Sequence, residues 1–200
     1  EIFPKGLSLW GTSKLDAYRK THEVIISPMG IEVDSQKLEL SNTGIKLLKE
    51  VYCTAIGNYP KFYKMDILSQ LGFVASELLL MAEGKERFVA CDDRAIILFG
   101  RNSSICADID YQETISKVEE FFPSPSLFVY TLPNIVTGEI ALRNKYHGET
   151  SYMLVDNIML AEEQIEIILQ TSVHLKSALC GWIDAKSNDD FEAKIWIVEK

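Results

Sequence analysis

The sequence has few cysteines and histidines, and neither type is spaced as a ligand set. The four cysteines contain no C-x-x-C pair, which gives no sign of a zinc site. We expect all four to be reduced thiols, because disulfides are uncommon in cytosolic proteins. The three histidines match no metal or triad spacing and are expected in loops or on the surface; they are His22, His147 and His174. Because no phosphate-binding glycine loop is present either, we expect no metal and no cofactor.

Positive charge and long apolar runs are also scarce. There are 20 Lys and Arg against 29 Asp and Glu, a net charge of −9, which argues against binding of nucleic acid or anionic membranes. No apolar run approaches the roughly 18 residues that span a bilayer, and no secretory signal is visible. We therefore expect a cytoplasmic protein without a membrane span. Its 200 residues fit one domain, with an irregular lead-in over residues 1–22.

Strands and helices alternate along the rest of the chain. The residue pattern predicts strands at 23–27, 31–34, 95–99, 151–155, 178–185 and 194–199. It predicts helices at 45–52, 66–80, 108–122, 132–144 and 158–171, with the third helix ended by Pro123 and Pro125. The first two strands are expected to form a hairpin, and the helix that begins at Asp66 is apolar nearly all round, so it should be deeply buried. This alternation indicates α/β layers and a mainly parallel sheet.

One segment has a distinctive order of residues, LPNIVTGEIA over 132–141, followed by Gly148. It resembles the segment before the nucleophilic cysteine of β-ketoacyl synthases, which form carbon–carbon bonds in fatty-acid and polyketide synthesis. The stretches ALCGWIDA (178–185) and KIWIVE (194–199) resemble two strands of the same family. The stretch YPKFYKMD (59–66) resembles its helix opening, and is still more similar to short ketosynthase-like proteins of bacterial pigment and aryl-polyene lipid clusters.

The resemblance covers residues 45–200 and implies an α/β fold, the N-terminal half of a thiolase-like fold, with a five-stranded mixed sheet flanked by helices. It ends where the second half of the family, which carries two catalytic histidines, would begin. Relatives pack two such halves and dimerise, so we expect a homodimer or heterodimer with strand 151–155 near its two-fold axis.

The family spacing from Gly148 places Asn157 at the nucleophile position, with Asp156 just before it. Condensation needs a thiolate there, and an amide cannot replace it. We therefore expect no catalytic residue and no condensing activity. In another interpretation Asn157 is only the N-cap of helix 158–171. Among the cysteines, Cys180 is expected in the core, whereas Cys91 and Cys106 are expected in loops beside strand 95–99, where either could be reactive.

Helix 158–171 is amphipathic rather than apolar all round. Its acidic and amide side chains gather on one face, and its apolar ones, Ala161, Ile165, Ile168 and Leu169, on another. A helix enclosed between two half-domains should be apolar on every side, because buried unpaired carboxylates are costly. We therefore expect the acidic face to be exposed, as it would be on any surface helix.

Five basic residues form two spots on this acidic chain: Lys61, Lys64, Arg143, Lys145 and His147. Ketosynthases meet acidic acyl carrier proteins through basic residues, so the resemblance implies partner binding here. The alternative is an ordinary solvated surface.

Three functions remain open at this point. The first is a non-condensing accessory ketosynthase-like protein of fatty-acid or polyketide-type (aryl polyene) biosynthesis, which binds a carrier protein or a ketosynthase subunit. The second is half of a β-ketoacyl synthase active site, an acyltransferase completed by another chain. The third is a thiolase-fold relic with an unrelated binding role.

Overall fold

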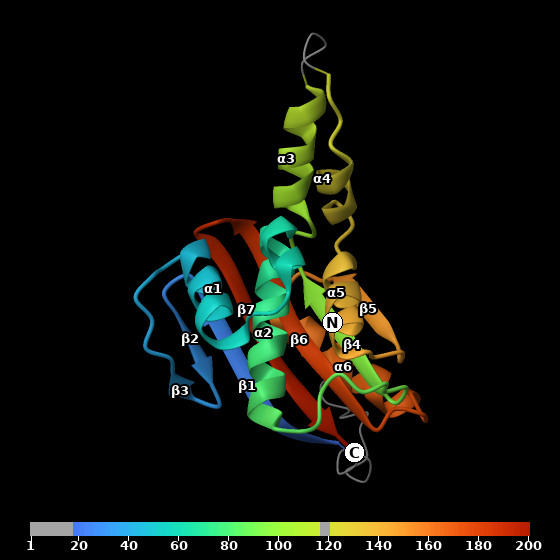
Figure 1. The fold of residues 1–200 in the computed structure, drawn as a ribbon. Coiled ribbons are helices and arrows are strands. Elements are labelled where there is room, and N and C mark those ends of the chain that lie inside the picture. Colours follow the sequence, from blue (N-terminus) through green and yellow to red (C-terminus); the bar gives the residue numbers. More distant parts are fainter. Residues whose placement is uncertain (1–17, 117–120) are drawn as a thin grey trace, which may run out of the picture.

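The computed structural model describes residues 18–116 and 121–200 (Figure 1). Seven strands form one sheet in the order β3-β2-β1-β7-β6-β4-β5. The strands are β1 (Arg19–Ser27), β2 (Gly30–Val33), β3 (Gln36–Lys37), β4 (Arg94–Gly100), β5 (Thr150–Leu154), β6 (Ser177–Ser187) and β7 (Asp190–Glu199). The α-helices are α1 (Ile45–Val51), α2 (Ile67–Glu83), α3 (Ile105–Ile115), α4 (Pro125–Tyr130), α5 (Ile135–Asn144) and α6 (Ile158–Thr171). A π-helical turn, η2 (Tyr52–Ile56), and a 3-10 turn, η3 (Pro60–Lys64), lie between α1 and α2.

The sheet is mixed, and the α/β class with helices on its faces is confirmed. Strand β4 pairs in parallel with β5 and β6, whereas the other pairings are antiparallel. The prediction of a mainly parallel sheet is therefore wrong, and so is the number of five strands. The additional strands form the expected hairpin of β1 and β2, which continues into β3. Asp34 and Ser35 form the turn between β2 and β3. Both have a positive φ, as this type of two-residue hairpin turn requires, although neither is glycine.

The first strand begins earlier than expected, at Arg19 rather than Glu23. Arg19 pairs with Glu199, so β7 extends β1 into the segment expected to be irregular. Residues 1–17 of that lead-in lie outside the described residues.

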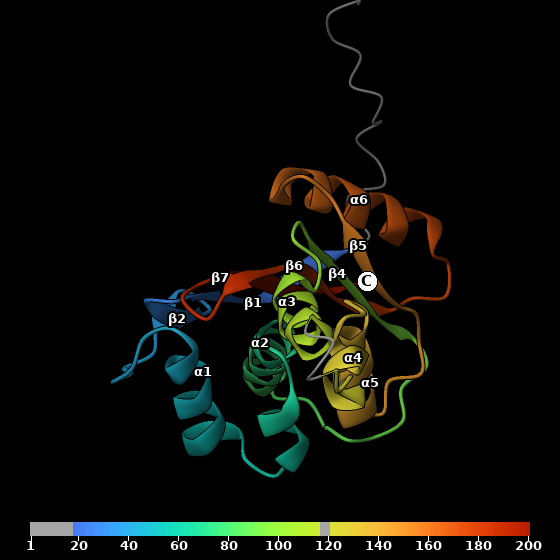
Figure 2. The ribbon, with the colours of Figure 1, turned by 90° about the horizontal axis from the view of Figure 1, so that it is seen from above.

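Helix α2 forms the centre of the core on one face of the sheet, together with α1 and α5 (Figure 2). Asp66 caps it, because its carboxylate accepts hydrogen bonds from the backbone N–H groups of Leu68 and Ser69. Every residue from 67 to 80 is buried, which confirms the prediction of a deeply buried helix. A Cβ at Gly72 would stand 2.3 Å from Cγ2 of Val136 on α5. Glycine here lets the two helices pack closely.

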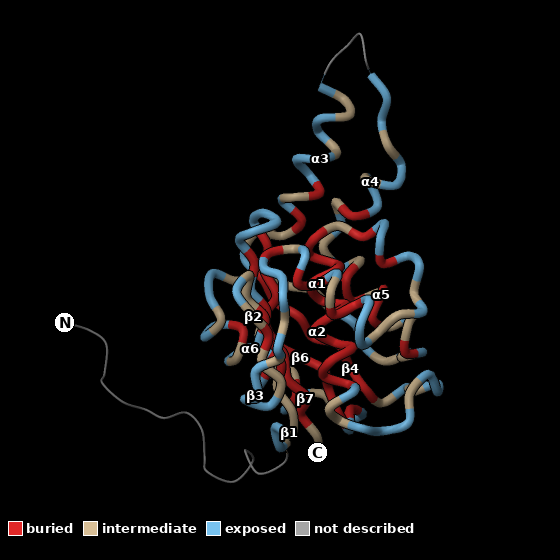
Figure 3. The backbone as a smooth tube through the Cα atoms, turned by 60° about the vertical axis from the view of Figure 1, so that its left-hand side comes forward, coloured by how far each residue is buried: buried red, intermediate tan, exposed pale blue. Residues whose placement is uncertain are grey.

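Helix α6 covers the opposite face, over β4 and β6. Its bounds match the prediction, and Ala161, Ile165 and Leu169 are the buried residues, whereas most of the outer face is exposed (Figure 3). The expected amphipathic character is thus confirmed. Met159 and Ile167, which are apolar, are also exposed on this helix.

Helices α3 and α4 lie side by side and project from the body of the molecule (Figure 1). In place of the helix predicted over 108–122, the structure has the shorter helix α3, which begins earlier, at Ile105. Helix α4 was not predicted from the sequence, because Pro123 and Pro125 indicate the end of a helix. Pro125 instead occupies the first turn of α4, where its missing N–H costs nothing, and Ser124 caps the helix. In the described part of the chain, no helix is long and apolar enough to cross a membrane.

Candidate functional site

The position predicted for a nucleophile lies at the start of α6, directly after β5. Asn157 occupies it in an extended conformation, and its Oδ1 accepts a hydrogen bond of 3.1 Å from the backbone N–H of Leu160. The interpretation of Asn157 as the N-cap is therefore confirmed. The side chain satisfies a helix donor, and it offers no thiol or hydroxyl for attack on an acyl group.

The turn after β4 holds the backbone before α6 in place. Asp184 on β6 is buried, and its Oδ1 accepts hydrogen bonds from the backbone N–H groups of Arg101 and Asn102, at 2.9 and 2.7 Å. The exposed Arg101 in turn donates from Nε to the carbonyl oxygen of Asp156, at 2.7 Å. The carboxylate of Asp184 thus fixes the turn that positions the start of α6.

A hollow of about 330 Å³ lies beside this helix start. Its lining combines apolar and polar side chains from β1, β6, β7 and α6: Ile25, Ile26, Ser27, Arg101, Asn157, Ile158, Trp182, Glu192, Ala193 and Lys194. Trp182 donates to Glu192 at 2.8 Å, and Lys194 pairs with Glu162 on α6 at 3.3 Å. The hollow has apolar walls and charged side chains of both signs, and no cysteine is among the described residues that line it. Such a surface can hold a ligand or a partner side chain rather than form a thioester.

The cysteines that could replace the missing nucleophile lie elsewhere. Cys180 is fully buried in β6, as predicted, and burial raises the pKa of its thiol. Cys106 lies within α3, so its predicted place in a loop is wrong. Burial is the main cause that raises the pKa of its thiol, and the negative charge of nearby carboxylates adds to this effect. A raised pKa leaves less thiolate, the opposite of what a nucleophile needs. Cys91 does lie outside the named strands, and its thiol donates to Asp93 at 3.3 Å.

Two of the five basic residues prove to be partners of buried carboxylates. Lys61 pairs with Glu139 of α5, and Arg143 lies 3.5 Å from the carboxylate of Glu77 of α2. Both glutamates are almost completely buried. Tyr59 lies between the two pairs, since its hydroxyl donates to Glu139 at 2.8 Å and Arg143 stands over its ring. Tyr59 and the two buried glutamates thus link one residue of each basic spot, although the Lys61 side chain itself is 48% exposed.

The other three basic residues are on the surface. Lys64 ends η3, and Lys145 ends α5 with a positive φ of 57°. Both are exposed. The ring of His147 lies 3.1 Å from Asp92, and both side chains are largely exposed. Among the described residues, no group of three His, Cys, Asp or Glu side chains gathers as a metal site.

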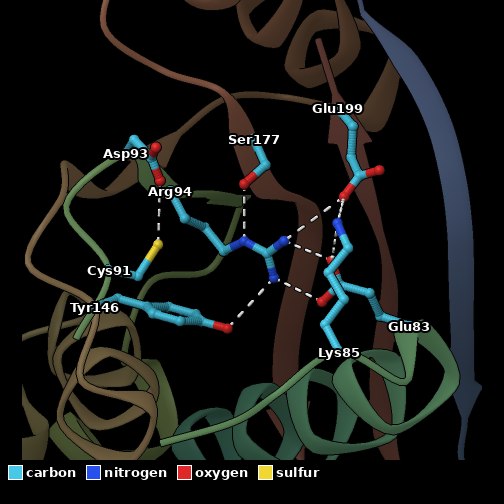
Figure 4. A network of polar contacts seen from close by, with 8 residues as sticks. All are labelled: Glu83, Lys85, Cys91, Asp93, Arg94, Tyr146, Ser177 and Glu199. Carbon is cyan, nitrogen blue, oxygen red and sulfur yellow. Dashed lines mark hydrogen bonds and ion pairs between the residues drawn. The ribbon is translucent and has the colours of Figure 1, made fainter. Parts of the chain in front are cut away.

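Sequence reasoning missed a second polar centre, around Arg94 at the start of β4 (Figure 4). Its guanidinium donates to Glu83 at 2.7 Å, to Ser177 Oγ at 2.9 Å and to the Tyr146 hydroxyl at 3.4 Å. Burial alone would lower the pKa of Arg94, but the hydrogen bonds and charges of Glu83 and Tyr146 together outweigh burial and raise that pKa. Arg94 stands directly before a continuous apolar run in the sequence. That position could have indicated a buried arginine, and a buried cation needs a partner.

Comparisons with known proteins show where this arrangement occurs. No family model and no curated protein matches the chain. Among solved structures, the ishigamide ketosynthase/chain length factor has a TM-score of 0.64 at 15% identity over 92% of this chain. The ketosynthase ApeO in complex with its chain length factor ApeC from Xenorhabdus doucetiae gives a TM-score of 0.58 at 13% identity, over 92% of this chain and 79% of that one. The type II PKS acyl-carrier protein–ketosynthase complex AntDE:AntF gives 0.56 at 10% identity, again over 92% of this chain.

The chain spans only 62% and 58% of the ishigamide and AntDE:AntF chains that it matches. Their sequence identity is low, so the likeness concerns the arrangement of strands and helices. That arrangement is the one that the motifs at 132–141, 178–185 and 194–199 predicted. This chain therefore has the thiolase-like fold of ketosynthases and chain length factors.

Proposed function

We propose that this chain is a non-condensing accessory subunit of fatty-acid or polyketide-type (aryl polyene) biosynthesis, which binds a ketosynthase or its carrier protein. The observation that carries the proposal is Asn157 at the start of α6, where the side chain caps the helix. Acyl transfer requires a nucleophile that can form a covalent intermediate, and an amide engaged as an N-cap cannot do so. The remaining role for such a fold lies in its surfaces, because function depends on sites rather than on folds.

The comparisons support this class of partner. One similar structure contains a ketosynthase with its chain length factor, and another contains a ketosynthase with an acyl-carrier protein. A subunit with the same fold, but with Asn157 in place of a nucleophilic cysteine, fits the role of the non-condensing subunit in such an assembly.

The free edge of β5 supports assembly into a dimer. Strand β5 ends the sheet and pairs only with β4 in the described structure. Its end residues Thr150 and Leu154 are exposed, and an unpaired strand edge is a template for pairing with another chain. We propose that one domain, residues 1–200, pairs through this edge with a ketosynthase or with a second copy.

A labelling experiment tests the absence of condensing chemistry. The chain is incubated with a radiolabelled acyl-pantetheine thioester beside a complete ketosynthase, and we expect label only on the ketosynthase. Label on Cys91 or Cys106 would contradict the proposal. Label that appears on this chain only after a partner ketosynthase is added would favour the alternative of an active site shared between two chains.

The variant Asn157→Cys tests whether the start of α6 is the nucleophile position. A thiol there would stand at the N-terminus of a helix of 14 residues, which lowers its pKa. We expect its alkylation by iodoacetamide at pH 7 to be at least tenfold faster than that of Cys106. Equal rates would show that this helix start does not activate a thiol.

A further inference from the structure

Helices α3 and α4 form an arm, defined as residues 105–116 and 121–132, that carries an unusual share of exposed apolar side chains. Ala107 and Tyr130 are the buried residues of the two helices. Large apolar side chains are instead exposed along the arm, with exposed fractions of 83% for Phe122, 61% for Phe121, 52% for Ile109, 52% for Phe128 and 51% for Leu132. Clusters of this kind usually mark an interface.

The contacts within the arm do not cover these side chains. The rings of Tyr111 and Phe128 lie 5.3 Å apart, and the backbone N–H of Phe122 donates to Thr114 at 3.1 Å. At the base, the hydroxyl of Ser104 donates to the carbonyl oxygen of Thr131 at 2.6 Å. These contacts fix the two helices to each other and to the body. Exposed stretches remain along both α3 and α4 (Figure 3).

The charge of the arm restricts what can cover it. Its described residues include Asp108, Asp110 and Glu113, all exposed, and no Lys or Arg. An acyl carrier protein, which is acidic, would be repelled. Two arms packed on each other in a symmetric pair would bring together six carboxylates, three from each copy. Like charges that meet across an interface oppose binding, and a basic rim favours it.

We propose that the arm docks into an apolar cleft with a basic rim on a ketosynthase partner, rather than on a carrier protein or on a second copy. The inference rests on the proposed function, because it assigns the ketosynthase to a particular surface of this chain. The arm and the edge of β5 would then be separate contact regions, and each can be tested without the other.

Binding of a purified ketosynthase from the source organism is measured by calorimetry for the following variants. The arm variant Phe121→Ser/Phe122→Ser removes exposed aromatic area. A matched control, Leu142→Ser on α5, removes another apolar side chain that is 72% exposed. The third variant, Leu154→Pro, removes a backbone N–H from the free edge of β5, since the N–H groups of the alternate residues face β4. Circular dichroism and a urea titration of each variant confirm that it is folded.

We expect the arm variant to raise the Kd for the ketosynthase at least tenfold and the Leu142 control to change it less than twofold, since exposed aromatic residues at the centre of an interface dominate binding. Asp108→Asn/Glu113→Gln should weaken binding most at low salt, because charge acts mainly on encounter.

Three outcomes would overturn the inference. If the arm variant binds like the wild type while Leu154→Pro does not, the arm is not the ketosynthase surface, although the proposed function stands. If the arm variant instead abolishes self-association in sedimentation, the occupant is a second copy. If the wild type binds no ketosynthase at all, the proposed function fails and the assignment of the arm fails with it.

Discussion

Replacement of Arg94 by methionine should destabilise the protein strongly. The guanidinium is the main partner of Glu83, whose side chain is only 4% exposed, and it also bonds Ser177 and Tyr146. Removal of one member of a buried ion pair costs about 3–5 kcal/mol, because the other charge stays buried. Lys85 remains 3.2 Å from Glu83 and offsets part of the loss. We therefore expect Arg94→Met to lower the free energy of unfolding by about 3 kcal/mol, which corresponds to a decrease in Tm of roughly 6–12 °C for a chain of this length.

The assay is urea denaturation followed by circular dichroism, at pH 7 and at pH 4. Burial acts to raise the pKa of Glu83, but Arg94 and Lys85 together outweigh burial and hold that pKa below its ordinary value. The stabilisation is therefore present at neutral pH and is lost as the pH falls through the folded-state pKa, so the variant should differ less from the wild type in acid. Glu83→Gln in the Arg94→Met background should recover at least half of the lost stability. A loss below about 1 kcal/mol at pH 7, or no recovery in the double variant, would refute the ion-pair argument.

Three further predictions concern the Lys61 ion pair, the helix cap at Asp66 and the contact between α2 and α5. Lys61→Glu should cost about 1.5–3 kcal/mol in urea denaturation, because it removes the partner of a buried carboxylate, whereas Lys64→Glu should stay within about 0.5 kcal/mol; equal effects would show that the Lys61 pair is not structural. Burial raises the pKa of Asp66, so this group stabilises the fold below its unfolded-state pKa and that contribution is lost as the pH rises through the folded-state value. Asp66→Asn keeps the helix cap and should be at least as stable as the wild type at pH 7, with a flatter pH profile between pH 4 and 7; a loss above about 1 kcal/mol would contradict this. Gly72→Ala should cost about 1–3 kcal/mol through the contact between α2 and α5, and Gly138→Ala, where a Cβ meets open space, should stabilise by up to about 1 kcal/mol; thermal melts that rank the two in the opposite order would refute the packing argument.

The local pattern predicted the helices and strands that bury one clear face. Helix α6 was placed to the residue because Asn157 caps it and its apolar residues recur at helical spacing. Helix α2 was predicted to be buried because it is apolar all round. Strand β3 was missed because it is two residues long and exposed, so it carries no period. The predicted breakers at Pro123 and Pro125 concealed α4, since proline ends one helix and begins another equally well.

The site shows the same limit more sharply. The motif that ends at Gly148 led to Asn157, because the spacing between them is local. It could not show that Lys61 and Arg143 pair with buried glutamates, because Glu77 and Glu139 lie on helices whose packing depends on the whole fold. Exposed charge and a counter-ion of the core have the same appearance in a sequence. Arg94 also donates to Ser177, which is 83 residues away in the sequence, and no local pattern shows such a contact.

The position of β1 within the sheet has a consequence for how the protein folds. Arg19 pairs with Glu199, and β1 lies between the β2–β3 hairpin and β7, the last described strand. During synthesis, β1 must therefore wait for the whole segment between β1 and β7 before its main partner leaves the ribosome. The helix α2, whose apolar surface covers β1, β6 and β7, is made long before that point. Pairing over so many residues slows folding, and the waiting apolar surface is a natural target for chaperones. Strand β1 should thus enter the sheet only after β7 has been made.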